Sequence, residues 1–244
     1  MSSELKLAKQ TAISASNLLK SNYLDKVGIL DTTFKDIKTD ADFAAHNHII
    51  EKLNITGIKI YSEESNDDYF NINDQQWIID PLDGTMNFSR GFPMAAISIS
   101  LWNNGKPVLG VIHDIFSNNT YYANQNGGAY LNEKKIFVSK EQKENNAIIA
   151  TGFPSGSRFT EDYLNDLVRH IKKYKKVRML GSASLMLAFV ANGFFDIYKE
   201  NDIYIWDVAS GLIIVDEAGG DYNFTPGSSS NMFNVKATNS LLRT

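Results

Sequence analysis

The stretch Ile78-Ile79-Asp80-Pro81-Leu82-Asp83-Gly84-Thr85 is the segment around which the rest of the chain is arranged. Its apolar start, together with Trp77, predicts a buried strand. We expect that strand to end at Asp80, because Pro81 lacks a backbone N–H and fixes its own φ. A second carboxylate, Asp83, follows with a glycine and a threonine. Two carboxylates at a strand end suit a hard cation, and the bare N–H groups of the next turn suit phosphate.

The same stretch also fits a plain turn, because Asp-Pro and Asp-Gly are both common turn dipeptides. Two better-known sites are excluded by spacing. An EF-hand loop needs oxygen ligands at alternate positions, one of which is occupied here by Leu82. A Walker loop needs a Gly-Lys-Ser/Thr sequence, which this chain lacks. The choice between a turn and a site therefore depends on the other acidic segments.

Composition and charge set the class of protein. The 244 residues include 43% hydrophobic and 21% charged residues, as is typical of a globular protein with a sizeable core. The net charge of −4 gives no general attraction to nucleic acid or to anionic membranes. The chain has no cysteine, no apolar signal core at its start and no long apolar run. We therefore expect a cytoplasmic protein whose partners include neither nucleic acid nor membrane.

The first half of the chain predicts an α+β arrangement. Apolar residues recur at helical spacing in 4–22 and 43–53, while 23–38 shows no clear pattern. Thr39 and Asp42 resemble an N-cap pair, which explains Asp42 without any catalytic role. Asn104-Gly105 indicates a hairpin turn within an antiparallel meander. The elements expected are strands at 57–61, 95–102, 108–115, 121–124 and beyond 128, with a short helix at 87–92.

The charged segment 139–146 marks the expected boundary between a half at 1–140 and a half at 141–244. In the second half strands and helices alternate, which predicts a mixed or largely parallel sheet. The site is expected between the halves, most of its metal ligands coming from the first. The elements expected are strands at 147–151, 177–180, 194–198, 221–224 and 234–237, and helices at 161–174, 183–191 and 207–217.

Acidic residues stand at the ends of several expected elements. If they converge, like charges at about 4 Å repel by about 4 kcal/mol per pair at an effective dielectric of about 20. Such a cluster needs protonation or bound cations. Oxygen ligands without cysteine favour Mg²⁺ or a close substitute. For Asp207, a helix N-cap is the alternative explanation. The acidic residues at element ends are Glu63, Glu64, Asp80, Asp83 and Asp207.

Four motifs carry a resemblance to a known family. They are Ser62-Glu63-Glu64-Ser65, Asp80–Thr85 with Asn87-Phe88, Trp206-Asp207 leading to Glu217-Ala218-Gly219-Gly220, and the weaker Gly181-Ser182-Ala183. The chain resembles the inositol monophosphatase family of Mg²⁺-dependent, lithium-sensitive phosphatases, in the superfamily that includes fructose-1,6-bisphosphatase. The resemblance covers nearly the whole chain. It implies a layered α-β-α-β-α sandwich with an antiparallel N-terminal sheet and a mixed or parallel C-terminal sheet.

The resemblance also implies a set of metal ligands. Glu63, Asp80 and the carbonyl of Leu82 would hold one ion, and Asp80, Asp83 and Asp207 a second. The expected cofactor is Mg²⁺, two or three ions per site, with Mn²⁺ or Ca²⁺ able to substitute. Glu64 is expected to lie behind the ligands.

The remaining roles concern the substrate. The amides of Gly84 and Thr85 would bind phosphate, and Thr85, oriented by Asp42, would act with Glu63 as the catalytic groups that activate water. Ala183 and Glu200, with Asp207, would contact the polyol ring. Met86 departs from the family pattern, and no lysine near 31–38 stands at the family's usual place.

The activity implied is hydrolysis of inositol monophosphate, or of a similar small sugar or polyol phosphate, by in-line attack of metal-activated water. The alternatives are a fructose-1,6-bisphosphatase, a histidinol-phosphatase or a 3′-phosphonucleotide phosphatase of the same superfamily. A non-catalytic, metal-dependent binding protein is a further alternative. The resemblance also implies a homodimer.

Overall fold

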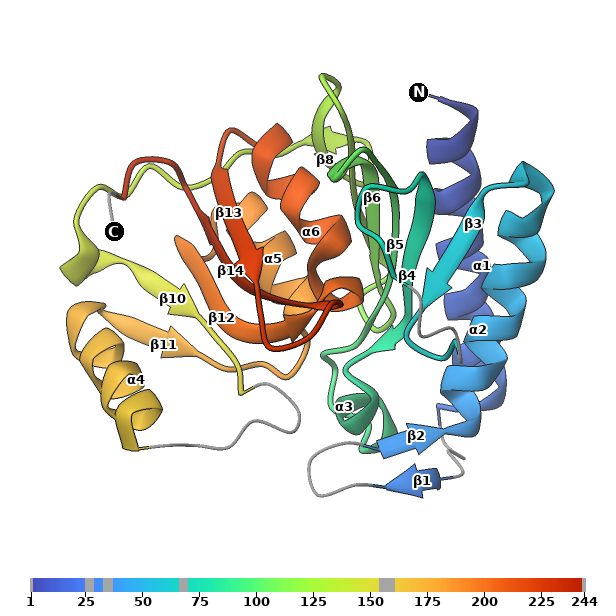
Figure 1. The fold of residues 1–244 in the computed structure, drawn as a ribbon, viewed down its shortest axis with the longest axis horizontal. Helices are drawn as coiled ribbons and strands as arrows, with labels where there is room; N and C mark the ends of the chain where they lie inside the picture. Colours follow the sequence, from blue (N-terminus) through green and yellow to red (C-terminus); the bar gives the residue numbers. More distant parts are fainter. Residues whose placement is uncertain (1, 25–28, 33–36, 66–69, 154–160, 243–244) are drawn as a thin grey trace.

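The computed structural model describes residues 2–24, 29–32, 37–65, 70–153 and 161–242. The chain forms five layers, in which helices alternate with two sheets (Figure 1). Helices α1 (Ser3–Asn22) and α2 (Asp40–Leu53) form the first layer, followed by a seven-stranded sheet. Helices α5 (Ala183–Ala191) and α6 (Ile205–Glu217) separate it from a five-stranded sheet, which α4 (Glu161–Lys173) covers. The predicted layered sandwich is confirmed.

The seven-stranded sheet has the order β3-β4-β5-β6-β7-β8-β9. From β4 onwards its neighbours are antiparallel, as predicted for the meander. β3 lies parallel to β4, so the sheet as a whole is mixed. Asn104 and Gly105 both have positive φ, 53° and 74°, which a type I′ hairpin turn requires. The strands are β3 (Lys59–Ser62), β4 (Gln76–Asp83), β5 (Ala96–Asn103), β6 (Lys106–Asp114), β7 (Asn119–Asn124), β8 (Gly128–Leu131) and β9 (Lys134–Lys135).

The prediction that the central strand ends at Asp80 is wrong. β4 continues to Asp83, and its pairing with β5 is interrupted between Asp80 and Asp83 and resumes where Asp83 lies opposite Ala96. A bulge accommodates Pro81, which has no N–H to donate to the ladder. The bulge changes the local twist and places two carboxylates at the end of one strand. The short helix α3 (Thr85–Ser89) follows at once, earlier than the predicted 87–92.

The segment 23–38, which shows no clear pattern in the sequence, contains most of an antiparallel pair of strands, β1 (Ile29–Thr32) and β2 (Ile37–Thr39). Strands of three or four residues are too short to show a reliable alternation. This pair forms a sheet of its own below α2 (Figure 1). Of the lysines near 31–38, Lys35 lies outside the described residues.

The second sheet has the order β11-β10-β12-β14-β13. β10 is parallel to β11 and β12, while β14 is antiparallel to both its neighbours, so the predicted mixed sheet is confirmed. β12 begins later than predicted, because the amides of Phe194 and Phe195 donate to the carbonyl of Phe189 and close the end of α5. The strands are β10 (Ile148–Ala150), β11 (Lys176–Arg178), β12 (Ile197–Tyr204), β13 (Asp221–Pro226) and β14 (Met232–Thr238); 3₁₀ turns lie at Asn54–Thr56 and Glu144–Asn146.

A shared core joins the two sheets. One hydrophobic cluster includes Ile78 and Ile112 of the first sheet, most of α5 and α6, and Val235 of the second sheet. Helix α6 comes close to the first sheet at Gly110, where an added Cβ would lie 2.5 Å from the carbonyl oxygen of Ser210. This close approach sets the distance between α6 and β6. The boundary between halves at residue 140 stays a proposal.

We expect Gly110→Ala to destabilise the fold by about 1–3 kcal/mol, because the new methyl group would push α6 off β6. Chemical denaturation would measure the change in the free energy of unfolding. The matched control is Gln10→Ala on the exposed side of α1, for which we expect a change within about 0.5 kcal/mol. Equal stability of the two variants would contradict the close contact.

Candidate active site

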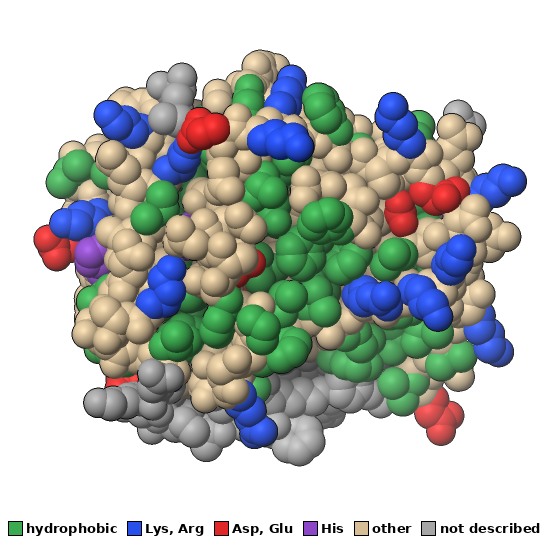
Figure 2. All heavy atoms as spheres, turned by 180° about the vertical axis from the view of Figure 1, so that it is seen from behind, with side chains coloured by type: hydrophobic (Ala, Val, Ile, Leu, Met, Phe, Trp, Pro, Cys, Tyr) green, Lys and Arg blue, Asp and Glu red, His purple; other side chains and the backbone are tan. Residues whose placement is uncertain are grey.

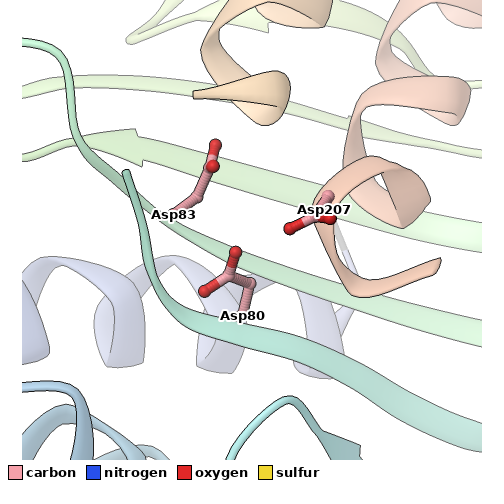
Figure 3. Close-up of side chains that lie close together, drawn as sticks. All are labelled: Asp80, Asp83 and Asp207. Atoms are coloured by element: carbon pink, nitrogen blue, oxygen red, sulfur yellow. The ribbon is translucent and has the colours of Figure 1, made fainter. Parts of the chain in front are cut away.

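Three carboxylates from both halves of the chain meet at one place. Asp80 and Asp83 come from the bulged end of β4, and Asp207 comes from the first turn of α6 (Figure 3). Oxygen atoms of the three side chains all lie within 4.8 Å of one another. The structure therefore brings together residues more than a hundred positions apart, as the sequence hypothesis required.

Glu63 and Glu64 occupy the turn after β3. Glu63 lines the same cavity as the three aspartates, and its charge raises the pKa of both Asp80 and Asp207. Its amide donates to the carbonyl of Ile79 at 3.3 Å, which fastens the turn to the central strand. Glu64 is buried, and its charge acts on Asp42 instead. Glu63 thus lines the cavity and Glu64 does not, while the metal role of Glu63 stays a prediction.

The acidic cluster is electrostatically strained. Burial, followed by the charge of Glu63 and then that of Asp83, raises the pKa of both Asp80 and Asp207 well above the usual range. Burial also raises the pKa of Asp83, although hydrogen bonds from Ser182 and Ser184 oppose the shift. Full ionisation of such a cluster needs a compensating cation. Buried oxygen donors converging on one point suit a hard divalent ion such as Mg²⁺.

The start of α5 holds Asp83 from the other half of the chain. Oδ2 of Asp83 accepts hydrogen bonds from Ser182 Oγ at 2.5 Å, from Ser184 N at 2.8 Å and from Ser184 Oγ. The amide of Ala183 approaches Oδ1 at 3.3 Å. Ser182 stood in a weak family motif, but Ser184 was not singled out by sequence. A serine in the first turn of a helix is too common to identify such a contact.

The two oxygens of Asp42 make separate contacts, one set with Thr39 at the cap of α2 and one with Thr85. Its Oδ2 accepts from the amide and the hydroxyl of Thr39, at 2.7 and 2.5 Å, and so completes the capping box of α2. Its Oδ1 accepts from Thr85 Oγ1 at 2.8 Å. Burial raises the pKa of Asp42 to about 6, against the hydrogen bonds from Thr39 and Thr85. A carboxylate has two oxygens, so a cap and a contact with Thr85 do not exclude one another.

Gly84 stands at a position that requires glycine. Its φ is +90°, and an added Cβ would lie 2.7 Å from the carbonyl oxygen of Met94 and 3.1 Å from that of Gly181. The Asn87 Nδ2 group donates to the carbonyls of Met94 and Leu180, each at 2.8 Å. The turn after β4 is thus clamped against the segment that precedes α5.

The predicted ring contacts, Ala183, Glu200 and Asp207, line the same cavity as Thr85. Tyr198 donates to Glu200 Oε2 at 2.9 Å, and burial raises the pKa of Glu200 to about 7. An added Cβ at Gly152 would meet that carboxylate at 2.6 Å. Trp206 belongs to one of the family motifs, but nothing in the sequence indicates that its ring stacks on Tyr204, with 4.5 Å between ring centroids, to line the cavity.

The cavity has a volume of about 270 Å³. A second cavity of about 30 Å³ lies on the α4 side of Glu200 and is too small for more than a water or two. Every predicted site residue except Asp42 lines the 270 Å³ cavity. The full lining consists of Glu63, Asp80, Leu82, Asp83, Gly84, Thr85, Met86, Gly152, Phe153, Gly181, Ser182, Ala183, Met186, Glu200, Asp202, Ile203, Tyr204, Trp206 and Asp207.

Comparisons with known proteins agree with this geometry. A family model described as the inositol monophosphatase family matches residues 1–239. The chain belongs to the inositol monophosphatase family. A relative from Thermotoga maritima, named fructose-1,6-bisphosphatase/inositol-1-monophosphatase, is 37% identical over 83% of this chain and 77% of its own length.

Two further relatives of this family have another kind of name. The Nus factor SuhB of Escherichia coli K12 is 34% identical over 88% of this chain and 83% of its own length. The solved structure of the extragenic suppressor protein suhB from Bartonella henselae matches with a TM-score of 0.87 at 30% identity, covering 98% of this chain and 95% of that one. The chain thus has the family's fold. Within the family, one relative is named as a phosphatase, and others are named as a Nus factor or a suppressor protein.

We expect the metal-free protein to lose stability as the pH rises from 5 to 8. The folded-state pKa of Glu200, about 7, lies above its ordinary value of 4.5, so its contribution is fully present below pH 4.5 and is lost as the pH rises through about 7. This shift corresponds to a loss on the order of 3 kcal/mol. Asp42, with a pKa of about 6, adds to the loss in the same direction.

Thermal unfolding in the presence of a chelator would measure this dependence. Glu200→Gln should flatten the profile, because the neutral amide has no proton to lose. Glu51→Gln, on the exposed face of α2, should leave the profile unchanged. A metal-free protein whose melting temperature rises over this range would contradict the assignment.

Proposed function

We propose that this protein is a Mg²⁺-dependent phosphomonoesterase that hydrolyses inositol monophosphate or a similar small sugar or polyol phosphate. The observation that carries the proposal is the contact between Thr85 Oγ1 and Asp42 Oδ1, 2.8 Å, beside the converging carboxylates. A metal-binding cluster alone would not need a hydroxyl held by a buried carboxylate. The pairing supplies an oriented group next to the place where phosphate would lie.

The acidic cluster fits the proposed ion. Asp80, Asp83 and Asp207 supply oxygen ligands whose charges need compensation, and Glu63 and the carbonyl of Leu82 complete the set proposed from sequence. When bound, Mg²⁺ neutralises charge on the ester and lowers the pKa of water. The proposal includes two or three such ions, with Mn²⁺ or Ca²⁺ as substitutes.

The chain's own residues orient the reactants. Oδ1 of Asp42 holds the Thr85 proton, so the lone pairs of Thr85 Oγ1 can accept a hydrogen from an attacking water. The carbonyl of Leu82, 3.0 Å from the same hydroxyl, limits its rotation. The amides of Gly84 and Thr85 are proposed to bind the phosphate, and Ala183 and Glu200, together with Asp207, the ring hydroxyls.

Other phosphate esters are alternatives within the same reaction. Fructose 1,6-bisphosphate, histidinol phosphate and 3′-phosphonucleotides differ from inositol phosphate in the group that would lie against the cavity wall. Glu200 favours a substrate with hydroxyl groups, because a buried carboxylate binds such donors well. The aromatic pair Tyr204 and Trp206 would also suit a flatter ligand, so a panel of esters is needed.

The relatives named as Nus factors favour a second candidate, a binding or regulatory protein without useful turnover. Such a protein has no need of the Thr85–Asp42 contact. We therefore place the enzyme first. Phosphate release from the panel, measured with Mg²⁺ and then with a chelator, would decide between the two, since a regulatory protein would release none under either condition.

Three expectations from the sequence stay proposals. Apolar side chains gather near the centre of the reverse face (Figure 2), and such areas often mark protein contacts, which supports the homodimer. Light scattering would test it by giving twice the chain mass of 27.3 kDa. Within the residues described, no helix is both long and apolar enough to cross a membrane. We also propose a cytoplasmic location and partners that do not include nucleic acid.

We expect Thr85→Ala to lower kcat by about 10²–10⁴, because the variant loses the group that orients water. Thr85→Ser should keep most of the activity. The matched control is Ser89→Ala in the same helix, whose hydroxyl donates to the carbonyl of Met86 at 2.9 Å and does not line the cavity. Wild-type turnover in Thr85→Ala would remove Thr85 from the mechanism.

A further inference from the structure

We infer that Ser182 and Ser184 are positioning residues that fix the Asp83 carboxylate so that one of its oxygens, Oδ1, faces the divalent cation. The inference rests on the metal role of Asp83 in the proposed function. It adds to that function that the start of α5, in the C-terminal half, sets the orientation of a metal ligand at the end of β4, in the N-terminal half.

The distribution of donors over the two oxygens of Asp83 carries the inference. Oδ2 receives three hydrogen bonds, from both serine hydroxyls and from the Ser184 amide. A carboxylate oxygen has two lone pairs, so three donors saturate Oδ2. Among the described residues, Oδ1 accepts from one donor, the Ala183 amide. The N···O distance of 3.3 Å is longer than that of a normal N–H···O bond. Oδ1 thus keeps its capacity to bind a cation.

The neighbouring carboxylates explain why Asp83 needs these hydrogen bonds. Asp80 and Asp207 have oxygens within 4.8 Å of Asp83, and like charges at that range would turn a free carboxylate away. Ser184 is fully buried and Ser182 nearly so, which keeps their hydrogen bonds out of competition with water. Asp83 also lies at the N-terminus of a nine-residue helix, whose dipole favours an anion.

A second set of contacts fixes the segment of the two serines against the end of β4. The Asn87 amide group donates to the carbonyls of Leu180 and Gly181, at 2.8 and 3.2 Å. Gly84 comes so close that an added Cβ would lie 3.1 Å from the carbonyl oxygen of Gly181. The segments 83–87 and 180–184 are therefore fastened along their length, and the serines cannot shift independently of the strand end.

The two serines differ in what else they do. Ser182 Oγ also accepts from the amide of Leu185 and so caps α5, which means that its removal would weaken the helix as well. The Ser184 hydroxyl donates to Asp83, and the Ser184 amide would remain in an alanine variant. Ser184→Ala is therefore the sharper test, and Ser182 supplies an independent one.

The experiment is a calorimetric titration of the full chain with Mg²⁺, without substrate. We expect Ser184→Ala to raise the Kd for Mg²⁺ by about 10-fold to 100-fold, the usual effect of removing a group that orients a ligand. The matched control is Ser100→Ala, which also removes a buried hydroxyl, one that donates to the carbonyl of Leu109 at 2.8 Å and does not line the cavity. Its Kd should equal that of the wild type.

A pair at the second serine keeps the test valid if Ser184→Ala does not fold. Ser182→Thr keeps a hydroxyl and a good N-cap, so its Kd should stay at the wild-type value, while Ser182→Ala should weaken binding. Melting temperatures with a chelator would be measured for every variant. A variant with a lower melting temperature and an unchanged Kd for Mg²⁺ would show a merely structural role and overturn the inference.

The outcome for the wild type separates this inference from the proposed function. A wild type that binds Mg²⁺, is weakened by the serine changes and yet cleaves no ester would support the inference and contradict the enzyme. A wild type that cleaves esters, with an unchanged Kd in Ser184→Ala, would overturn the inference alone. A wild type that binds no Mg²⁺ would overturn both.

Discussion

The constraint on which this structure depends is the crowding of buried carboxylates between two sheets. Asp80, Asp83 and Asp207 are brought together by backbone elements whose places are set elsewhere. The central strand is buried along its whole length, and α6 is fixed on β6 by the bare Cα of Gly110. Repulsion of about 4 kcal/mol per close pair is offset by the burial of two or three large apolar side chains. The core that holds the site contains many more than that.

The elements predicted from sequence were those with a strong local pattern. α5 and α6 are apolar and well bounded, and the hairpin at Asn104-Gly105 has the residues that its turn demands. The prediction failed at Pro81, because the rule that proline leaves a sheet does not include a bulge that absorbs it. β1 and β2 were missed because neither is long enough to show a period.

The candidate site shows a similar division. Acidic residues at element ends could be found in the sequence, since each stands at a change of pattern. The residues that form hydrogen bonds with these acidic side chains could not be found in this way. The contacts of Ser184 with Asp83, and of Tyr198 with Glu200, depend on how two sheets are stacked, and no local pattern in the sequence records it. For Asp42 the two hypotheses proved compatible, because each oxygen has its own partners.

The strain in the cluster is itself an argument about function. A chain that had no use for a cation could relieve the repulsion by changing one aspartate to a neutral residue, and the metal-free fold would gain stability. This chain instead keeps the three aspartates, places Glu63 beside them and uses the start of α5 to hold Asp83 among them. Proteins generally retain such local conflict where a site requires it. The presence of this conflict here favours a bound cation over a purely architectural role for the three aspartates.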